Sequence, residues 1–250
     1  MKRLSVSGLI LLFSCIMCLA QSGKAVTVVD FDHPPFAYQD ANSQEAKGAE
    51  IAYLTAILKD LGYQPTFTFV PFARLINMLQ SGESDIGPLL MKTAEREEFV
   101  YFSSKSVLTM NPVLVVLKDS PLKQLKTLSN LKGMNIWFTA NLTVPAFFKN
   151  SNFPFNMTTG RYVTEQNFNM LKAKRFDAFL EMNPYNLKVA AKTLGLADSI
   201  RIIEVPKSAS VYYCTIAKKS KIAAELLKGI NAGMNTRKYD FEKFFQEELK

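Results

Sequence analysis

Polar side chains follow apolar segments at several points of the chain. Residues 86–91 are apolar, and Thr93, Glu95 and Arg96 come soon after them. A second segment, residues 26–30, ends on the carboxylate of Asp30 and leads into an aromatic-rich loop that contains His33. Polar groups placed just beyond the C-terminal end of a strand are how open α/β sheets present residues to a ligand. The spacing therefore predicts ligand binding at the ends of buried strands.

One of these patterns occurs twice. Met78-Leu79 precedes Asp85 by the same spacing as Met170-Leu171 precedes Asp177, and an apolar run follows each aspartate. The repetition predicts two similar α/β lobes with a ligand-binding cleft between them.

Helices and strands alternate in the first part of the chain. Apolar residues with β-strand or helical spacing predict these elements, and glycines end both helices. The expected strands are 26–30, 66–70 and 86–91, and the expected helices are 48–62 and 71–82. Connections of this βαβαβ kind predict mainly parallel sheets.

A second set of strands and helices follows, and a later strand returns the chain to the first lobe. We therefore expect a signal segment at 1–20, a first lobe at 21–110 plus 212–250, and a second lobe at 111–211. Two crossing segments would form a hinge that lets the lobes close over the cleft.

Composition narrows the class of protein. The chain has 250 residues, of which 48% are hydrophobic and 21% charged, as in a globular protein with a substantial core. The formal charge of +8 comes from scattered basic residues that do not alternate with aromatics, which argues against nucleic-acid binding. The single histidine argues against a zinc site built from histidines, and we expect no metal or other cofactor.

The N-terminus resembles a secretory signal. Lys2 and Arg3 precede an apolar run that ends near Ala20, where small residues suit signal peptidase. A short membrane anchor and a lipoprotein attached at Cys15 are the alternatives. Cleavage after Ala20 would place the protein in the periplasm and leave Cys214 as its only cysteine, which we expect to be a buried, inert thiol.

Several short motifs in this order carry a family resemblance that covers essentially the whole exported chain. They are Pro35-Phe36, the helix from Gly48 to Leu61-Gly62, Leu79…Gly82…Asp85, Thr93…Arg96, Phe102-Ser103 and Asp177-Ala178. With them the chain resembles the periplasmic solute-binding proteins of amino-acid ABC importers, known as family 3. The resemblance implies the two-lobed type II periplasmic-binding-protein fold, often compared to a Venus flytrap.

The resemblance also implies roles for individual residues. Arg96 would hold the carboxylate of the ligand through two parallel hydrogen bonds, with support from Thr93. Phe72 would pack on the ligand, Asp30 would lie beside the pocket, and His33 occupies a position that is often aromatic. The residues expected to contact ligand are Arg96, Thr93, Phe72, Asp30, His33, Arg74, Leu90, Thr143 and Glu181.

Each of these roles has a structural alternative. Arg96 could form a surface ion pair with a neighbouring glutamate, Phe72 could belong to the apolar face of its helix, and Arg74 could be a solvated helix position.

Two methionines depart from the family's pattern. Met91 stands where a serine or threonine is common, and Met182 stands where an aspartate pairs with the ammonium group of an amino acid. Glu181 and Asn183 flank Met182, but strand side chains alternate between faces, so neither is expected to replace that aspartate directly. The identity of the ligand therefore stays open.

The function expected from these features is binding without catalysis. A monomeric protein would capture a small carboxylate-bearing solute for an ABC permease. A free-standing sensor that signals to a membrane receptor is one alternative, and a dehydratase-like enzyme using Glu50 or Glu181 as an acid or base is another.

Overall fold

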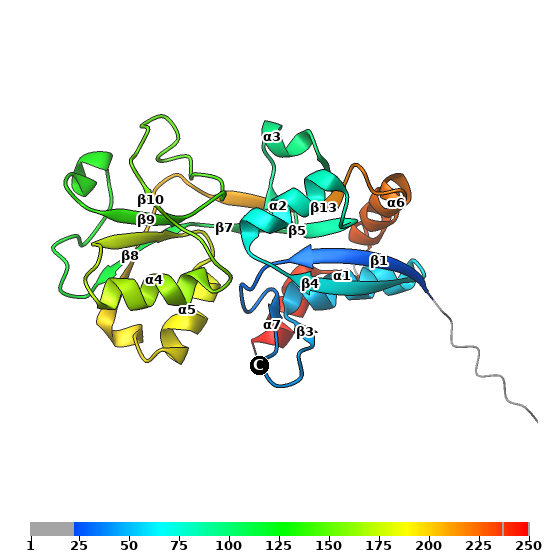
Figure 1. The fold of residues 1–250 in the computed structure, drawn as a ribbon, viewed down its shortest axis with the longest axis horizontal. Helices are drawn as coiled ribbons and strands as arrows, with labels where there is room; N and C mark the ends of the chain where they lie inside the picture. Colours follow the sequence, from blue (N-terminus) through cyan, green and yellow to red (C-terminus); the bar gives the residue numbers. More distant parts are fainter. Residues whose placement is uncertain (1–22, 237, 250) are drawn as a thin grey trace, which may run out of the picture.

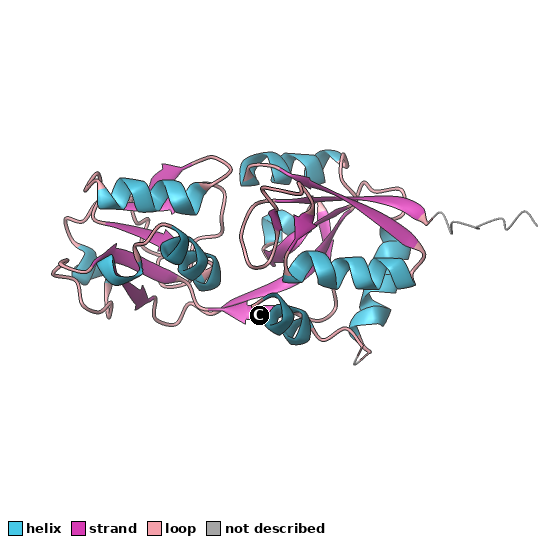
Figure 2. Ribbon diagram, turned by 90° about the horizontal axis from the view of Figure 1, so that it is seen from below, coloured by secondary structure: helices cyan, strands magenta, loops and turns pink. Residues whose placement is uncertain are grey.

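The computed structural model describes residues 23–236 and 238–249 and shows an α/β protein with two main sheets. The two sheets lie side by side along the long axis of the molecule, and helices pack on each of them (Figures 1 and 2). The expected signal segment at 1–20 lies outside the described residues. None of the described helices is both long and apolar enough to cross a membrane.

The first lobe is built on a six-stranded sheet with the order β4-β1-β5-β13-β6, in which β7 also pairs with β13. The strands are β1 (Lys24–Asp30), β4 (Tyr63–Phe69), β5 (Ile86–Met91), β6 (Val100–Phe102), β7 (Leu108–Met110) and β13 (Ser210–Ala217). The helices of this lobe are α1 (Ala49–Asp60), α2 (Phe72–Ser81), α3 (Ala94–Glu97), α6 (Ala223–Met234) and α7 (Phe241–Glu248). A small hairpin, β2 (Tyr38–Gln39) with β3 (Ala46–Lys47), precedes α1.

The second lobe is built on a five-stranded sheet with the order β10-β9-β11-β8-β12. Its strands are β8 (Val113–Leu117), β9 (Ile136–Thr139), β10 (Asn156–Thr158), β11 (Ala178–Glu181) and β12 (Ile200–Glu204). Its helices are α4 (Val163–Lys172) and α5 (Pro184–Thr193), with short 3₁₀ turns at Leu128–Leu131 and Ala197–Ser199.

Two segments connect the lobes, as the sequence predicted. The chain leaves the first sheet after β7 and enters the second at β8, and it returns between β12 and β13. The sheets are mixed, however, and not mainly parallel. β1 is parallel to β4 and β5, and β9 is parallel to β10 and β11, whereas β13 and β8 are antiparallel to their neighbours. These two antiparallel strands directly follow the crossings, so they enter each sheet in the opposite direction to its βαβ strands.

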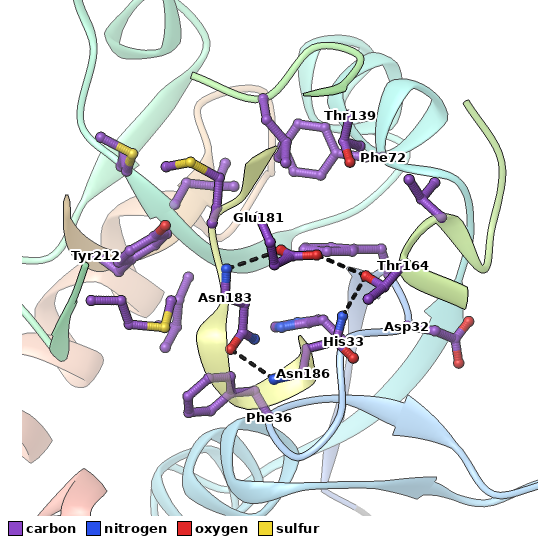
Figure 3. Close-up of a pocket in the computed structure, with 18 of the residues that line it drawn as sticks. Asp32, His33, Phe36, Phe72, Thr139, Thr164, Glu181, Asn183, Asn186 and Tyr212 are labelled. Atoms are coloured by element: carbon purple, nitrogen blue, oxygen red, sulfur yellow. Dashed lines mark hydrogen bonds between the residues drawn. The ribbon is translucent and has the colours of Figure 1, made fainter. Parts of the chain in front are cut away.

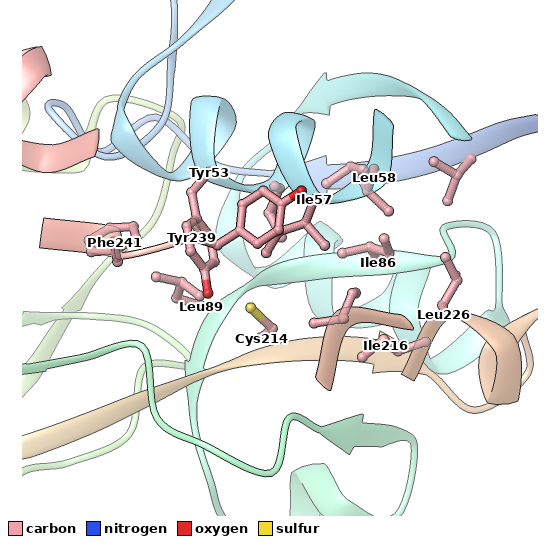
Figure 4. Close-up of a cluster of buried hydrophobic side chains, with 14 of the residues drawn as sticks. Tyr53, Ile57, Leu58, Ile86, Leu89, Cys214, Ile216, Leu226, Tyr239 and Phe241 are labelled. Carbon is pink, nitrogen blue, oxygen red and sulfur yellow. The ribbon is translucent and has the colours of Figure 1, made fainter. Parts of the chain in front are cut away.

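The core of the first lobe lies between its sheet and helices α1, α6 and α7. Figure 4 shows the side chains of α1 facing β5 and β13, with Cys214 among them. Cys214 is 1% exposed and forms no disulfide, and burial raises the pKa of its thiol. The prediction of a buried cysteine is confirmed, and a protonated thiol in this position is a poor nucleophile.

Candidate ligand-binding cleft

A cavity of about 80 Å³ lies between the two lobes. Both lobes contribute to its wall. Its polar and aromatic lining includes His33, Glu50, Phe72 and Arg96 from the first lobe and Thr143, Arg161, Thr164, Glu181, Asn183 and Asn186 from the second. A pocket walled by two lobes suits a ligand that favours their closed arrangement, because such a ligand contacts both.

Of the two arginines that line this cavity, Arg161 pairs with Asp32, and Arg96 is the buried one. Its side chain is largely buried, with the residue 6% exposed, and burial lowers the pKa of its guanidinium. Nη1 donates to the carbonyl of Met91 at 3.1 Å, and Nη2 donates to the carbonyl of Asn141 in the other lobe at 3.4 Å. The guanidinium also lies 5.7 Å from the ring centre of Phe72.

No carboxylate within residues 23–236 and 238–249 forms an ion pair with Arg96. The alternative of a surface ion pair with its neighbours is therefore not observed, and Glu97 pairs with Lys92 instead. Carbonyl oxygens satisfy some of the five N–H donors of Arg96 but do not neutralise its charge. A buried cation without an anionic partner is suited to an anionic ligand group.

Thr93 does not line the cavity. It is the N-cap of α3, and its hydroxyl accepts a hydrogen bond from the backbone amide of Arg96 at 3.2 Å. Its position fits an indirect role, since the cap fixes the short helical turn that carries Arg96.

Phe72 and Leu90 line the cavity and are also buried in the core. The two interpretations of Phe72 therefore do not exclude each other: its ring packs edge-on against Phe31 at 5.2 Å and also borders the cavity. Thr143, in the segment after β9, lines the cavity from the second lobe.

Asp30, His33 and Glu50 form a buried cluster beside the cavity. The imidazole Nε2 of His33 lies 3.2 Å from Asp30 Oδ1 and 3.8 Å from Glu50 Oε2. His33 and Glu50 line the cavity, whereas Asp30 lies behind them. Burial and the nearby charge of Asp30 raise the pKa of Glu50 well above its ordinary value.

The position of Glu50 depends on Gly48. Gly48 has a φ of +117°, and a Cβ atom there would lie 2.2 Å from the carbonyl oxygen of Phe36. Only glycine fits this close approach, which brings the first turn of α1 against the loop that carries His33. From the sequence, Glu50 was expected only as a possible acid or base, and Gly48, two residues earlier, was the signal for a close backbone approach.

Glu181, Met182 and Asn183 all line the cavity, contrary to the alternation expected of a strand. The reason is that β11 ends at Glu181, and Asn183 is already the N-cap of α5. Glu181 accepts hydrogen bonds from the hydroxyl of Thr164 at 2.9 Å and the backbone amide of Asn183 at 3.0 Å (Figure 3). Burial raises the pKa of Glu181.

Arg74 lies away from the cavity lining. Its side chain is 66% exposed and lies 3.9 Å from Glu83. Arg74 is therefore a solvated helix residue, which was the alternative to a ligand contact. Arg161 was not predicted from the sequence to belong to the site. Its guanidinium pairs across the lobes with Asp32 and donates to the side-chain oxygen of Gln39 at 2.8 Å. No local motif marks this contact, because its partners lie in different lobes.

Comparison with known proteins identifies the family of this protein. The family of bacterial extracellular solute-binding proteins called family 3 matches residues 26–247. The chain belongs to this family. No curated protein matches the sequence.

Solved structures of similar proteins share the fold of this solute-binding protein. An ancestral arginine-binding protein bound to arginine is 26% identical, with a TM-score of 0.73, and the match covers 90% of this chain and 98% of the other. The substrate-binding protein of an ABC uptake transporter from Streptococcus pneumoniae, with bound histidine, is 20% identical, with a TM-score of 0.76. The match covers 92% of this chain and 94% of the other. A histidine kinase sensor domain with similarity to periplasmic binding proteins is 16% identical, with a TM-score of 0.77 and coverage of 92% and 97%.

These matches confirm the two-lobed type II periplasmic-binding-protein fold and the family resemblance of the solute-binding protein. The family is described as one of extracellular solute-binding proteins.

Proposed function

We propose that the protein binds a small, amino-acid-like solute that carries a carboxylate, and presents it to the permease of an ABC importer. The observation that carries this proposal is the buried Arg96, which lines the cavity and has no carboxylate partner among the described residues. Its remaining donors could bind a carboxylate of the ligand. Proteins of the same fold bind arginine and histidine.

The second lobe offers a place for a cationic group of the same ligand. Glu181 is buried against the cavity, and its two oxygens accept from Thr164 and Asn183. A carboxylate oxygen can accept more than one hydrogen bond, so an ammonium group of the ligand would find an acceptor here. The methionines Met91 and Met182 add apolar surface, which favours a ligand that also has an apolar part.

A thermal-shift screen of the processed protein against amino acids, small carboxylates, polyamines and sugars tests the proposal. A ligand at about a hundred times its dissociation constant stabilises a protein by about 2.7 kcal/mol, which corresponds to roughly 5–10 °C for a chain of this size. We expect such a shift with a carboxylate-bearing amino acid. The shift should be lost in Arg96→Ala and kept in the matched control Arg74→Ala, which removes an exposed arginine. A carboxylate that still shifts Arg96→Ala by the full amount would contradict the role of Arg96.

The lobe boundaries, location and assembly are part of the same proposal. We place the first lobe at 21–110 plus 212–250 and the second at 111–211, which agrees with the division of the strands between the two sheets except that β13 begins at Ser210. After cleavage of residues 1–20, the protein would act as a periplasmic monomer. Mass spectrometry of the exported protein would give the cleavage site, and sedimentation would give the assembly state.

A ligand sensor for a membrane receptor is the second candidate function. The likeness to a histidine kinase sensor domain shows that this fold also occurs in signalling proteins. Co-purification of the ligand-bound protein with an ABC permease would favour transport, and co-purification with a receptor would favour sensing. NMR of the bound solute over time should show no turnover, and a new product would instead indicate an enzyme.

A further inference from the structure

We propose that Asp30, His33 and Glu50 form a binding site for a divalent transition-metal ion, of which Zn²⁺ is the representative, beside the ligand cavity. Each of the three residues can offer one ligand atom, and these atoms all lie within 4.8 Å of one another. The single histidine of the chain argued against a site built from several histidines. One imidazole with two carboxylates is a different donor set that the sequence spacing did not reveal.

Unpartnered oxygen atoms point to a cation. Asp30 and Glu50 are both 0% exposed, and their Oδ2 and Oε2 atoms have no hydrogen-bond partner in the described part of the chain. Buried carboxylates are ordinarily paired with a cation or bound to a metal, because an unpaired buried charge is costly. A divalent cation balances two carboxylates beside a neutral imidazole.

The distances suit a metal of this size. Bonds of about 2.0–2.2 Å from zinc to nitrogen and oxygen ligands place neighbouring ligand atoms roughly 3–4 Å apart. His33 Nε2 lies 3.2 Å from Asp30 Oδ1 and 3.8 Å from Glu50 Oε2. All three ligand atoms lie within 4.8 Å of one another, so the side chains must move somewhat closer together to hold one ion.

Hydrogen bonds and packing already hold the three side chains in place. The backbone amide of Phe31 donates to Asp30 Oδ1 at 2.7 Å, and the backbone amide of Leu89 donates to Glu50 Oε1 at 2.7 Å, so one oxygen of each carboxylate is anchored. The imidazole of His33 stacks on the ring of Phe31 with 4.1 Å between the ring centres. Such support of the ligands by surrounding groups is typical of metal sites.

The donor types select the kind of ion. Mg²⁺ and Ca²⁺ prefer sites made only of oxygen, whereas an imidazole favours Zn²⁺ and similar ions. Three protein ligands leave a position for solvent or for a donor atom of the bound solute. The ion could enter from the cavity, because His33 and Glu50 line it.

Calorimetric titration with Zn²⁺ tests this site. The full processed protein, purified without a polyhistidine tag and stripped with a chelator, should bind one equivalent of Zn²⁺. Binding should weaken more than about 100-fold in His33→Gln and in Glu50→Gln, since loss of even a surrounding group costs 10–100-fold. The matched control Glu83→Gln makes the same change at an exposed glutamate outside the cavity lining and should keep the wild-type affinity for Zn²⁺.

A second measurement does not depend on the variants folding. The chain contains one histidine, so the imidazole signals in the NMR spectrum of the tag-free wild-type protein belong to His33. These signals should shift to a single bound state at one equivalent of Zn²⁺. The proposal is overturned if they stay unchanged at saturating Zn²⁺, if no saturable binding occurs, or if both His33→Gln and Glu50→Gln bind like the wild type. These results would leave the carboxylate-binding proposal untouched, because the solute screen uses Arg96.

Discussion

Asp85 shows how a single side chain fixes the start of a strand. It accepts hydrogen bonds from the backbone amide and the hydroxyl of Thr27 at 2.9 and 2.8 Å, and from the hydroxyl of Ser220 at 2.6 Å. Partial burial by itself would raise the pKa of Asp85, but the hydrogen bonds from Ser220 and Thr27 outweigh it and lower the pKa below 3.8. The folded state therefore prefers the ionised carboxylate.

This preference predicts an acid-dependent loss of stability. A carboxylate whose pKa is lower in the folded state stabilises the protein fully above its unfolded pKa, near 3.8, and loses this contribution as the pH falls through the lower folded value. We expect Asp85→Asn to lower the free energy of unfolding by about 1–2 kcal/mol at pH 7 and to lose less on acidification than the wild type. Urea unfolding at pH 7 and pH 3 measures both.

Asp198→Asn, which changes an exposed aspartate, is the control and should behave like the wild type at both pH values. Equal losses for the wild type and Asp85→Asn between the two pH values would exclude Asp85 as a source of the acid sensitivity.

At the scale of elements, the repeated motif in the sequence has a structural counterpart. The backbone amide of Asn135, just before β9, donates to Asp177 Oδ2 at 2.7 Å, as the amide of Thr27 in β1 does to Asp85. In each lobe, an aspartate before a central strand holds the neighbouring parallel strand. The motif could be recognised from spacing alone, because in both lobes the aspartate follows the end of a helix and precedes an apolar strand at the same spacing.

The elements around Glu181 were predicted less well. The strand was expected to run from Asp177 to Met182, but it ends at Glu181, and Asn183 is already the N-cap of α5. The sequence did carry a signal, since asparagine before proline is a common helix start. Contacts between lobes had no such local signal, and neither did the approach of Asp30, His33 and Glu50, because tertiary packing alone brings these residues together.

The cap itself can be tested by substitution. Asn183 Oδ1 accepts from the backbone amides of Tyr185 and Asn186 at 3.0 and 3.1 Å. We expect Asn183→Ala to destabilise the protein by about 1 kcal/mol, since it removes the cap, and Asn183→Asp to keep most of the stability. Chemical denaturation of the three proteins makes the comparison. Equal stability of Asn183→Ala and the wild type would show that the cap contributes nothing.

At the scale of the whole molecule, direct contacts hold the two lobes together. Arg161 of the second lobe pairs with Asp32 and Gln39 of the first. Tyr185 of the second lobe also packs edge-on against Phe36 of the first, with 5.8 Å between the ring centres. These contacts favour the closed arrangement of the lobes, and any ligand that also favours it binds more tightly as a result.

Removing the Arg161 contacts should shift the molecule toward an open form. We expect Arg161→Ala to increase the radius of gyration in small-angle scattering. It should also weaken solute binding about fivefold, which corresponds to about 1 kcal/mol, as for a partly exposed ion pair. Arg175→Ala, which removes an exposed arginine of the same lobe, is the control. An Arg161→Ala protein with unchanged scattering and affinity would rule out this contact as a determinant of closure.

The central claim is that the buried Arg96 binds a carboxylate of the solute. The most direct measurement is calorimetric titration of the processed protein with the amino acid found by the screen and with the corresponding amine, which lacks only the carboxylate. We predict that the amine binds wild-type protein at least about 100-fold more weakly, because charged hydrogen bonds to the guanidinium are lost, and that Arg96→Ala removes this difference. An amine that binds the wild type as tightly as the amino acid would contradict the claim.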